Sequence, residues 1–300
     1  MESNWTIERT GMINDYQTNV VYLADGIRHY MPLAINMFNA LEREEIEVHL
    51  LRHTESAKHV WARDYMPLQL DEKRFLQYRY APDYLRNDPD YIPPYETICR
   101  GLHLKCKQTK LVIDGGNVVK SGKRVIMTDK VFKENPGYLP DDLRRRLEET
   151  FECEVCIIPW DRYEIFGHAD GMVRSIGDND VLMNNYIDLD KSFRERLKNA
   201  LEVEGFYVEE LHYDMPRPSR QSWAYLNFLQ VKKCIFVPGL GIREDELAVK
   251  QIQKYYPHYR VVLVPDCLSL VRDGGALNCI SWNIRTVEQD LTQDELKTIS

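Results

Sequence analysis

Residues 272–282 of this 300-residue chain read RDGGALNCISW. A carboxylate, an amide and a thiol stand here beside apolar residues that are typical of a strand. Such polar groups need hydrogen-bonding partners when they are buried, so their position inside an apolar run indicates that other polar groups lie close to them in the fold. Four other segments have the same character: VWARDYMP (60–67), LVIDGGNVV (111–119), IFGHADGMV (165–173) and SWAYLNFLQV (222–231).

The polar positions of these segments recur at a nearly even step. Asp64 and Asp114 are 50 positions apart, and Asp114 and His168 are 54 apart. His168 and Asn227 are 59 apart, and Asn227 and Cys279 are 52 apart. This step predicts five similar units, each a helix plus strands of about 55–60 residues, closed in a ring around an axis. In such a ring, each unit brings one polar residue to a common centre.

Helix and strand patterns alternate along the chain, which predicts an α/β protein. Apolar residues three and four positions apart predict helices over residues 28–43, 140–151, 193–201 and 247–255. Apolar runs and alternation predict strands over residues 20–23 and 46–50, and a hairpin of residues 173–176 and 181–183. No Ser/Gly-rich linker or shift in composition marks a boundary, so residues 1–300 are predicted to form one domain.

The composition excludes several classes of protein. The chain has 47 acidic and 39 basic residues, a formal net charge of −8, 44% apolar residues, 15 Gly and 14 Pro. These values exclude a collagen-like, a low-complexity and a disordered chain. No apolar run approaches the ~20 residues of a membrane span, and the acidity argues against general DNA binding. A cationic small molecule is a more suitable partner.

The seven cysteines predict a reduced, cytoplasmic protein. Their number is odd, and the first thirty residues lack the apolar core of a signal peptide, so disulfides are not expected. Cys153 and Cys156 form a Cys-x-x-Cys pair, but they lie in a strand-like segment with no second pair at zinc spacing. They are interpreted as buried structural residues.

Two loops stand out by their composition. Residues 78–95, YRYAPDYLRNDPDYIPPY, contain four prolines and five tyrosines without a helix or strand period. This predicts a long ordered loop, which is either packed surface or a lid or wall over a site. In the loop PRPSR (216–220), Arg217 and Arg220 are either solvated or available to a substrate carboxylate.

The reactive residues favour chemistry on a cation. Cys279 is a candidate nucleophile if a neighbouring group lowers its thiol pKa from the free value of about 8.5. His168 is the natural partner, as an imidazolium or as a general acid and base. Asp170 follows two positions later and faces the same way in a strand, and Asp64 and Asp114 would add negative charge. Such a site suits a planar cation rich in N–H donors, as a guanidinium is.

Together, the five segments resemble the agmatine deiminase and Porphyromonas-type peptidylarginine deiminase family. The motifs that carry the resemblance occur in the order of that family, between residues 45 and 285: WARDYMP (61–67), GGN (115–117), GHAD (167–170), WAYLNF (223–228) and GGALNCI (274–280). The family belongs to the guanidine-modifying superfamily. The resemblance implies a five-bladed pseudo-symmetric α/β propeller, the pentein fold, which agrees with the ring that the spacing predicts.

The resemblance also implies roles for individual residues. Cys279 attacks the guanidinium carbon, His168 acts as general acid and base, and Asp64 and Asp170 hold the guanidinium nitrogens. Ammonia leaves, a covalent thiouronium forms on the sulfur, and water then releases a ureido product. No metal and no organic cofactor are implied.

Further positions are implied to bind substrate: Trp61, Asp114, Asn117 and Asn227. Trp61 would form a flanking wall and Asn227 part of the pocket. Agmatine deiminases usually carry Glu where this chain has Asp114, and His where it has Asn278. A shorter acid near the pocket changes what fits the far end of the substrate.

The main hypothesis is a cysteine hydrolase that deiminates agmatine, free arginine or arginine in a peptide. An amidinotransferase shares the thiouronium but passes the amidino group to an amine, and the sequence does not separate the two. A non-catalytic guanidinium-binding protein is an alternative from another class. A papain-like protease is disfavoured because its Cys precedes its His, whereas His168 comes before Cys279.

The predicted partner is a guanidino small molecule or an arginine side chain. No nucleic acid or membrane is expected as a partner, and the sequence leaves open whether the protein forms a homo-oligomer.

Overall fold

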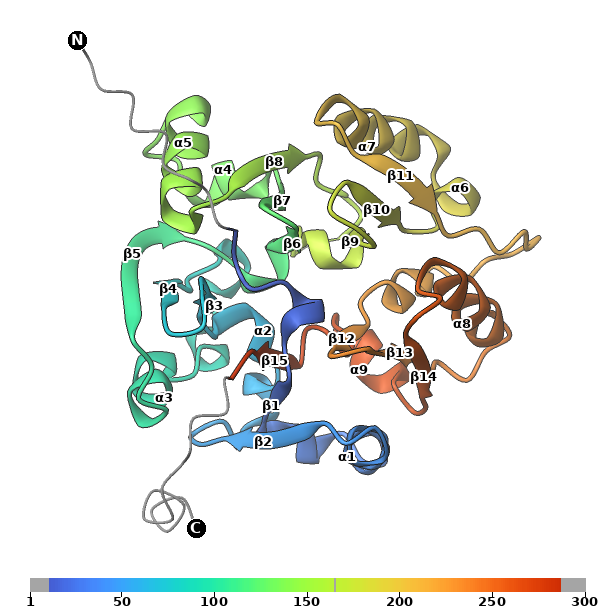
Figure 1. The fold of residues 1–300 in the computed structure, drawn as a ribbon, viewed down its shortest axis with the longest axis horizontal. Coiled ribbons are helices and arrows are strands. Elements are labelled where there is room, and N and C mark those ends of the chain that lie inside the picture. The colour runs from blue at the N-terminus through green and yellow to red at the C-terminus, as the bar shows by residue number, and fades with distance from the viewer. Residues whose placement is uncertain (1–10, 165, 287–300) are drawn as a thin grey trace.

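Five three-stranded sheets stand in a ring in the computed structural model, which describes residues 11–164 and 166–286 (Figure 1). In strand order, the sheets are β15 (Ser281–Ile284), β1 (Val20–Ala24) and β2 (Glu47–Leu51); β3 (Leu68–Gln69), β4 (Phe75–Arg79) and β5 (Cys106–Val112); β6 (Val119–Ser121), β7 (Arg124–Thr128) and β8 (Glu154–Ile158); β9 (Val173–Ser175), β10 (Asp180–Met183) and β11 (Tyr207–Glu210); β12 (Leu229–Val231), β13 (Cys234–Pro238) and β14 (Arg260–Val264). The antiparallel pairing of β15 with β1 closes the ring. The five units predicted from the spacing are therefore confirmed.

The five sheets share one connectivity. In each, the first strand pairs antiparallel with the second, and the second pairs parallel with the third. Parallel neighbours need a crossover connection, and each sheet has a helix there: α1 (Leu33–Arg43), α3 (Tyr95–Gly101), α5 (Pro140–Phe151), α7 (Lys191–Val203) and α8 (Glu244–Tyr255). These helices lie on the outside of the ring (Figure 1). The shorter helices are α2 (Ala62–Tyr65), α4 (Lys130–Glu134), α6 (Tyr186–Leu189) and α9 (Leu268–Arg272).

The helix predicted over residues 140–151 forms with the expected inward face. Its fully buried residues are Leu143, Leu147 and Phe151. Pro140 occupies the first helical position, where its missing N–H is not needed. The predicted helices over 193–201 and 247–255 also form, as parts of the longer α7 and α8. The predicted hairpin consists of β9 and β10.

The helix predicted over residues 28–43 is wrong in its first turns. The chain forms a 3-10 turn over Asp25–His29, and α1 begins only at Leu33. The cause is Pro32, because the residue before a proline is disfavoured in the helical region. Met31 therefore interrupts the helical pattern that the apolar spacing alone suggested.

The Cys-x-x-Cys pair is part of the core, as predicted. Cys156 lies in β8, Cys153 directly precedes that strand, and both side chains are buried. Among the described residues, no group of three or more His, Cys, Asp or Glu side chains is arranged to hold a metal ion. None of the helices in the described part of the chain has the length and apolar character needed to cross a membrane.

The predicted long loop is ordered between β4 and α3. Two 3-10 turns, Asp83–Leu85 and Pro89–Tyr91, divide it into short pieces. Several of its tyrosines turn inward, and Tyr80 is buried. We refer to residues 80–91 as the wall segment, since they form one side of the cavity described below.

Candidate active site

The five polar positions occupy equivalent places in the fold, which explains their even spacing. Each lies in or beside a short turn that leads into the first strand of its sheet. Asp64 precedes β3, Asp114 precedes β6, His168 precedes β9, Asn227 precedes β12 and Cys279 precedes β15. Because the first strands face the centre of the ring, these turns bring residues from all five sheets together.

The thiol of Cys279 is held by groups from two neighbouring units. It donates to Asn227 Oδ1 at 3.2 Å, and its sulfur lies 3.8 Å from Asp170 Oδ2. The Nδ2 of Asn278 donates to the same Asp170 oxygen at 2.6 Å. The backbone N–H of Asn278 also donates to the carbonyl of Asn227 at 3.0 Å. Asn278 therefore anchors the carboxylate beside the candidate nucleophile.

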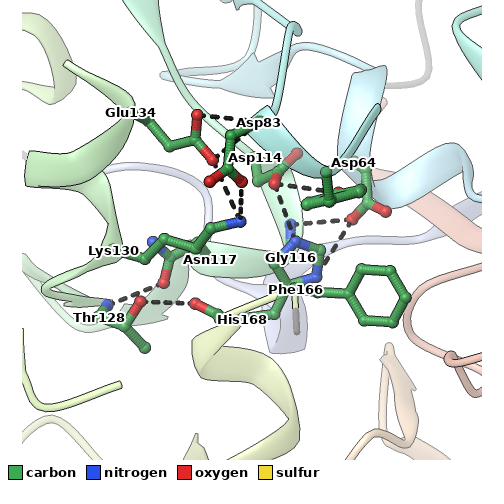
Figure 2. Close-up of polar contacts among 12 residues, drawn as sticks. Asp64, Asp83, Asp114, Gly116, Asn117, Thr128, Lys130, Glu134, Phe166 and His168 are labelled. Atoms are coloured by element: carbon green, nitrogen blue, oxygen red, sulfur yellow. Dashed lines mark hydrogen bonds and ion pairs between the residues drawn. The ribbon is translucent and has the colours of Figure 1, made fainter. Parts of the chain in front are cut away.

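His168 lies between two carboxylates (Figure 2). Its Nε2 is 3.0 Å from Asp114 Oδ2, and its Nδ1 is 3.8 Å from Asp64 Oδ1. Tyr84, in the wall segment, donates its hydroxyl to the same Asp114 oxygen at 3.1 Å. The backbone N–H of Gly116 donates to Asp64 Oδ1 at 3.2 Å. An imidazolium can donate from both ring nitrogens, so this arrangement suits a protonated His168.

The glycines of the DGGN motif allow this close approach. A Cβ at Gly116 would lie 2.4 Å from His168 Nδ1 and 2.8 Å from Asp64 Oδ1. A Cβ at Gly115 would lie 1.9 Å from the carbonyl oxygen of Arg63. A side chain at either position would therefore push the Asp64 turn away from the histidine.

Burial and charge set the protonation states of the site. Burial alone would lower the pKa of His168, but Asp64 and Asp114 outweigh it and raise the pKa to about 10. Burial, followed by the charges of Asp114 and Asp170, raises the pKa of Asp64 to about 8, although His168 opposes this rise. Burial and the charges of Asp170 and Asp64 raise the pKa of the Cys279 thiol well above its ordinary value. A bound cation would offset these carboxylates and favour the thiolate.

Two cavities meet at the reactive groups. The first, of about 270 Å³, is lined by Trp61 and Asp64 together with five residues of the wall segment, and we call it the Trp61 cavity. The second, of about 220 Å³, is lined by Asp170, Trp223 and Asn227 among others, and we call it the Trp223 cavity. Both are bordered by Phe166, His168, Gly274 and Cys279. Phe166 packs on Gly274, where a Cβ would lie 2.5 Å from its ring.

Most of the residues implicated by the sequence come together here. Those that line the two cavities are Trp61, Asp64, His168, Asp170, Asn227 and Cys279. Asp114 lines neither cavity but contacts His168. Asn117 lines neither cavity, and its buried Oδ1 accepts the backbone N–H of Thr128 at 2.8 Å. Arg220 borders the Trp223 cavity, whereas Arg217 borders neither.

Sequence reasoning missed Glu164 and Tyr84. The Glu164 carboxylate accepts the backbone N–H groups of Phe166 at 2.6 Å and of His168 at 3.3 Å, so it shapes the turn that carries the histidine. Burial raises the pKa of this carboxyl. An acid four residues before a candidate histidine was the available signal for Glu164. For Tyr84, the signal was the tyrosine-rich composition of its loop.

The sequence matches known proteins over most of its length. The sequence model of the Porphyromonas-type peptidyl-arginine deiminase family matches residues 2–284. A curated relative from Mycoplasma capricolum, named "Putative agmatine deiminase", is 22% identical over an alignment that covers 61% of this chain and 60% of that protein. The aligned part thus spans less than two thirds of that relative's length.

Solved structures of similar proteins establish the fold. The agmatine deiminase of Enterococcus faecalis is 18% identical, with a TM-score of 0.72, and the match covers 92% of this chain and 96% of that one. The C. jejuni agmatine deiminase is 16% identical, with a TM-score of 0.71 over 93% and 97% of the two chains. The fold is therefore the five-bladed α/β propeller, or pentein fold. Because the family's sequence model matches nearly the entire chain, this protein belongs to the Porphyromonas-type peptidyl-arginine deiminase family.

Proposed function

We propose that this protein deiminates a guanidino compound to a ureido product and ammonia, with Cys279 as the nucleophile. The observation that carries the proposal is the meeting of a thiol, a histidine and two carboxylates, from three of the five units, where the two cavities adjoin. Asp64, His168 and Cys279 line the Trp61 cavity, and Asp170 lies within 3.8 Å of the sulfur. Membership in the deiminase family supports the same reaction class.

In the proposed first half-reaction, Asp64 and Asp170 hold the nitrogens of the guanidinium and place its carbon next to Cys279. The positive charge of the substrate offsets the carboxylates, so the thiol releases its proton to water as the substrate binds. The thiolate attacks the carbon, and His168 donates a proton to the departing nitrogen. Ammonia leaves, and the substituted amidino group stays on the sulfur as a thiouronium.

In the proposed second half-reaction, His168 is neutral and accepts a proton from water. The resulting hydroxide attacks the thiouronium carbon, and the C–S bond breaks as the hydroxyl proton passes to the departing sulfur. This releases the ureido product and restores the Cys279 thiol, while the released ammonia takes up a proton from water. The overall change is guanidinium plus water to urea derivative plus ammonium, so His168 ends protonated as it began. Its pKa, raised to about 10, means that the ring begins the cycle protonated at neutral pH, as a proton donor must.

The rim of the Trp61 cavity supports a substrate with a cationic far end. Asp88 and Asp273 line this cavity, and the remaining lining is mostly aromatic. Tyr30 donates its hydroxyl to Asp273 Oδ2 at 2.9 Å and orients that carboxylate. Two acidic groups attract an amine and repel a carboxylate. We therefore propose an amine-tailed guanidine of the agmatine type in preference to free arginine.

The test is ammonia release from agmatine, arginine and a peptide containing internal arginine, with mass spectrometry of the ureido product. Cys279→Ser should release none, while the wild-type protein should release most from agmatine. A haloacetamidine probe should label Cys279 in the wild-type protein. Absence of both ammonia and labelling would leave a guanidinium-binding protein as the better description.

Amidino transfer is a second candidate, favoured by one observation. The Trp223 cavity also reaches Cys279, so it offers room for an acceptor, and Arg220 among its lining residues suits the carboxylate of an amino-acid acceptor such as glycine. In that reaction the substituted amine leaves first, and a second amine replaces water in attacking the thiouronium. Incubation of a donor labelled in its amidino group with glycine and alkylamines would separate the two reactions. Labelled new guanidines indicate transfer, and labelled urea derivatives indicate hydrolysis.

A further inference from the structure

A buried ion cluster lies beside the site, outside the groups that face substrate (Figure 2). Lys130, in α4, is 2% exposed at its side chain. Its Nζ lies 3.1 Å from Asp83 Oδ1 and 3.1 Å from Glu134 Oε1. A buried ammonium needs such partners, and buried carboxylates left without a cation are strongly destabilising. Lys130 lines neither the Trp61 cavity nor the Trp223 cavity.

This cluster joins α4 to the wall segment. Asp83 belongs to the wall segment, and its backbone N–H donates to the Glu134 carboxylate at 3.1 and 3.2 Å. Lys133 also contacts Asp83, at 2.6 Å, but its side chain is 58% exposed. Solvent therefore screens the Lys133 pair, whereas the Lys130 pair is shielded from water.

The residue after Asp83 reaches the catalytic histidine. The ammonium of Lys130 lies 4.4 Å from the centre of the Tyr84 ring, within the range of a cation–π contact. The Tyr84 hydroxyl donates to Asp114 Oδ2, the same oxygen that lies 3.0 Å from His168 Nε2. Lys130 thus contacts the ring of Tyr84, and the Tyr84 hydroxyl in turn binds the Asp114 carboxylate that contacts His168.

Lys130 also contacts the backbone that carries His168. A Cβ at Gly167 would lie 2.4 Å from Lys130 Cδ, so the lysine stem packs directly on this glycine. Gly167 has a φ of +70°, a conformation that favours glycine. Its carbonyl accepts the hydroxyl of Thr128 at 2.5 Å. One side chain therefore touches both the backbone before His168 and the tyrosine on its carboxylate partner.

We propose that Lys130 is a positioning residue of this site, which holds Tyr84 on Asp114 and thereby sets the orientation of the His168 ring. It touches no substrate in this scheme and acts through Tyr84 and Gly167. The proposal rests on the proposed function for its kinetic readout, but it also predicts a change in His168 that is measurable without turnover.

The kinetic test compares Lys130→Met with Lys133→Met, which removes the exposed partner of the same carboxylate. Lys130→Met should lower kcat about tenfold while KM changes less than about threefold, since one positioning hydrogen bond is at stake. Lys133→Met should stay within about twofold of wild type. Equal losses in the two variants, or a Lys130→Met variant with wild-type kcat, would overturn the proposal.

A double-mutant cycle then separates positioning from general damage. Tyr84→Phe removes only the hydroxyl that contacts Asp114. Because Lys130 acts in part through Tyr84, the Lys130→Met/Tyr84→Phe double variant should lose less kcat than the product of the two single losses. A product of the two single losses would show independent effects and contradict the proposal. Lys130→Arg, which keeps the charge, should recover part of kcat.

A spectroscopic measurement tests the positioning of His168 without relying on turnover. In protein labelled with 15N-histidine, the ring signals of His168, assigned with His168→Gln, should move in Lys130→Met and stay in place in Lys133→Met. If wild-type protein releases no ammonia, the proposed function fails, and these signals still decide the positioning role. If Lys130→Met does not fold, Asp83→Asn is used in both measurements, and unchanged His168 signals there would overturn the proposal.

Discussion

The Nε2 of His168 lies 3.0 Å from the Oδ2 of Asp114. Their residues come from turns 54 positions apart in the chain. Both side chains are largely removed from water, so the attraction between them is weakly screened. Asp64 and Asp114 together raise the pKa of His168 to about 10, which favours the protonated ring at neutral pH.

Stability should fall as the pH rises through the range in which His168 titrates. Its pKa is raised from 6.5 to about 10, so between these values the folded protein binds a proton that the unfolded chain has released. The stabilisation is complete below pH 6.5 and is lost as the pH approaches 10. In urea unfolding, His168→Gln should remove up to about 1.4 kcal/mol per pH unit of this dependence. His49→Gln is the control, because His49 pairs with Glu47 at the exposed surface. An equal pH dependence in both variants would contradict this role.

Cys279→Ala should abolish ammonia release, because the thiolate is the only proposed nucleophile. Cys153→Ala should leave kcat/KM almost unchanged, since Cys153 lies in the core next to β8 and lines neither cavity. Steady-state ammonia assays at matched protein concentration measure both. Equal loss in the two variants would show that Cys279 has been wrongly chosen.

Asp64→Asn and Asp170→Asn should each reduce kcat/KM strongly. Each removes one charge from a buried contact that the proposed function gives to the guanidinium, and such losses cost about 3–5 kcal/mol. The reduction should be seen in kcat/KM for agmatine, while circular dichroism checks that the fold is retained. Near-wild-type efficiency in either variant would remove that residue from the site.

Gly116→Ala should impair catalysis through displacement of His168. The added Cβ would lie 2.4 Å from Nδ1 of the histidine and 2.8 Å from Asp64 Oδ1, so one of these groups must move. A shift of this size can lower kcat about 10²-fold. Gly137→Ala is a matched control, because a Cβ there meets nothing within 4 Å. The prediction fails if the two alanine variants have the same kcat.

Asp88→Asn/Asp273→Asn should weaken binding of agmatine and spare binding of an uncharged alkylguanidine. Both carboxylates are at the open rim of the Trp61 cavity, where an exposed charge pair contributes about 0.2–1 kcal/mol. KM for agmatine should therefore rise about fivefold or less per charge, with kcat little changed. A similar rise in KM for both substrates would argue against an amine-binding rim.

The ring was predictable because its units repeat. Each unit uses a similar length of chain, so the polar turn before each first strand recurs after 50–59 positions. The candidate residues were predictable for the same reason, since Asp64, His168 and Cys279 interrupt apolar segments where a polar group must have a partner. The start of α1 was not predicted, because apolar periodicity carries no information on the backbone restriction that Pro32 imposes.

The partners of these residues were not predictable in the same way. Asn117 has the motif position of a substrate-binding residue, but its amide bonds to the backbone of Thr128. Lys130 and Tyr84 are 46 positions apart and show no shared pattern, yet the Lys130 ammonium lies over the Tyr84 ring. Such contacts depend on how two separate turns approach one another.

Residue types and their intervals along the chain were thus enough to predict the five-unit ring and to nominate the candidate reactive groups at its centre. The pairing of individual atoms and the protonation states came from the folded arrangement. Those properties depend on distances of a few ångströms and on exclusion of water, and both change steeply with the relative placement of segments that lie far apart in the sequence.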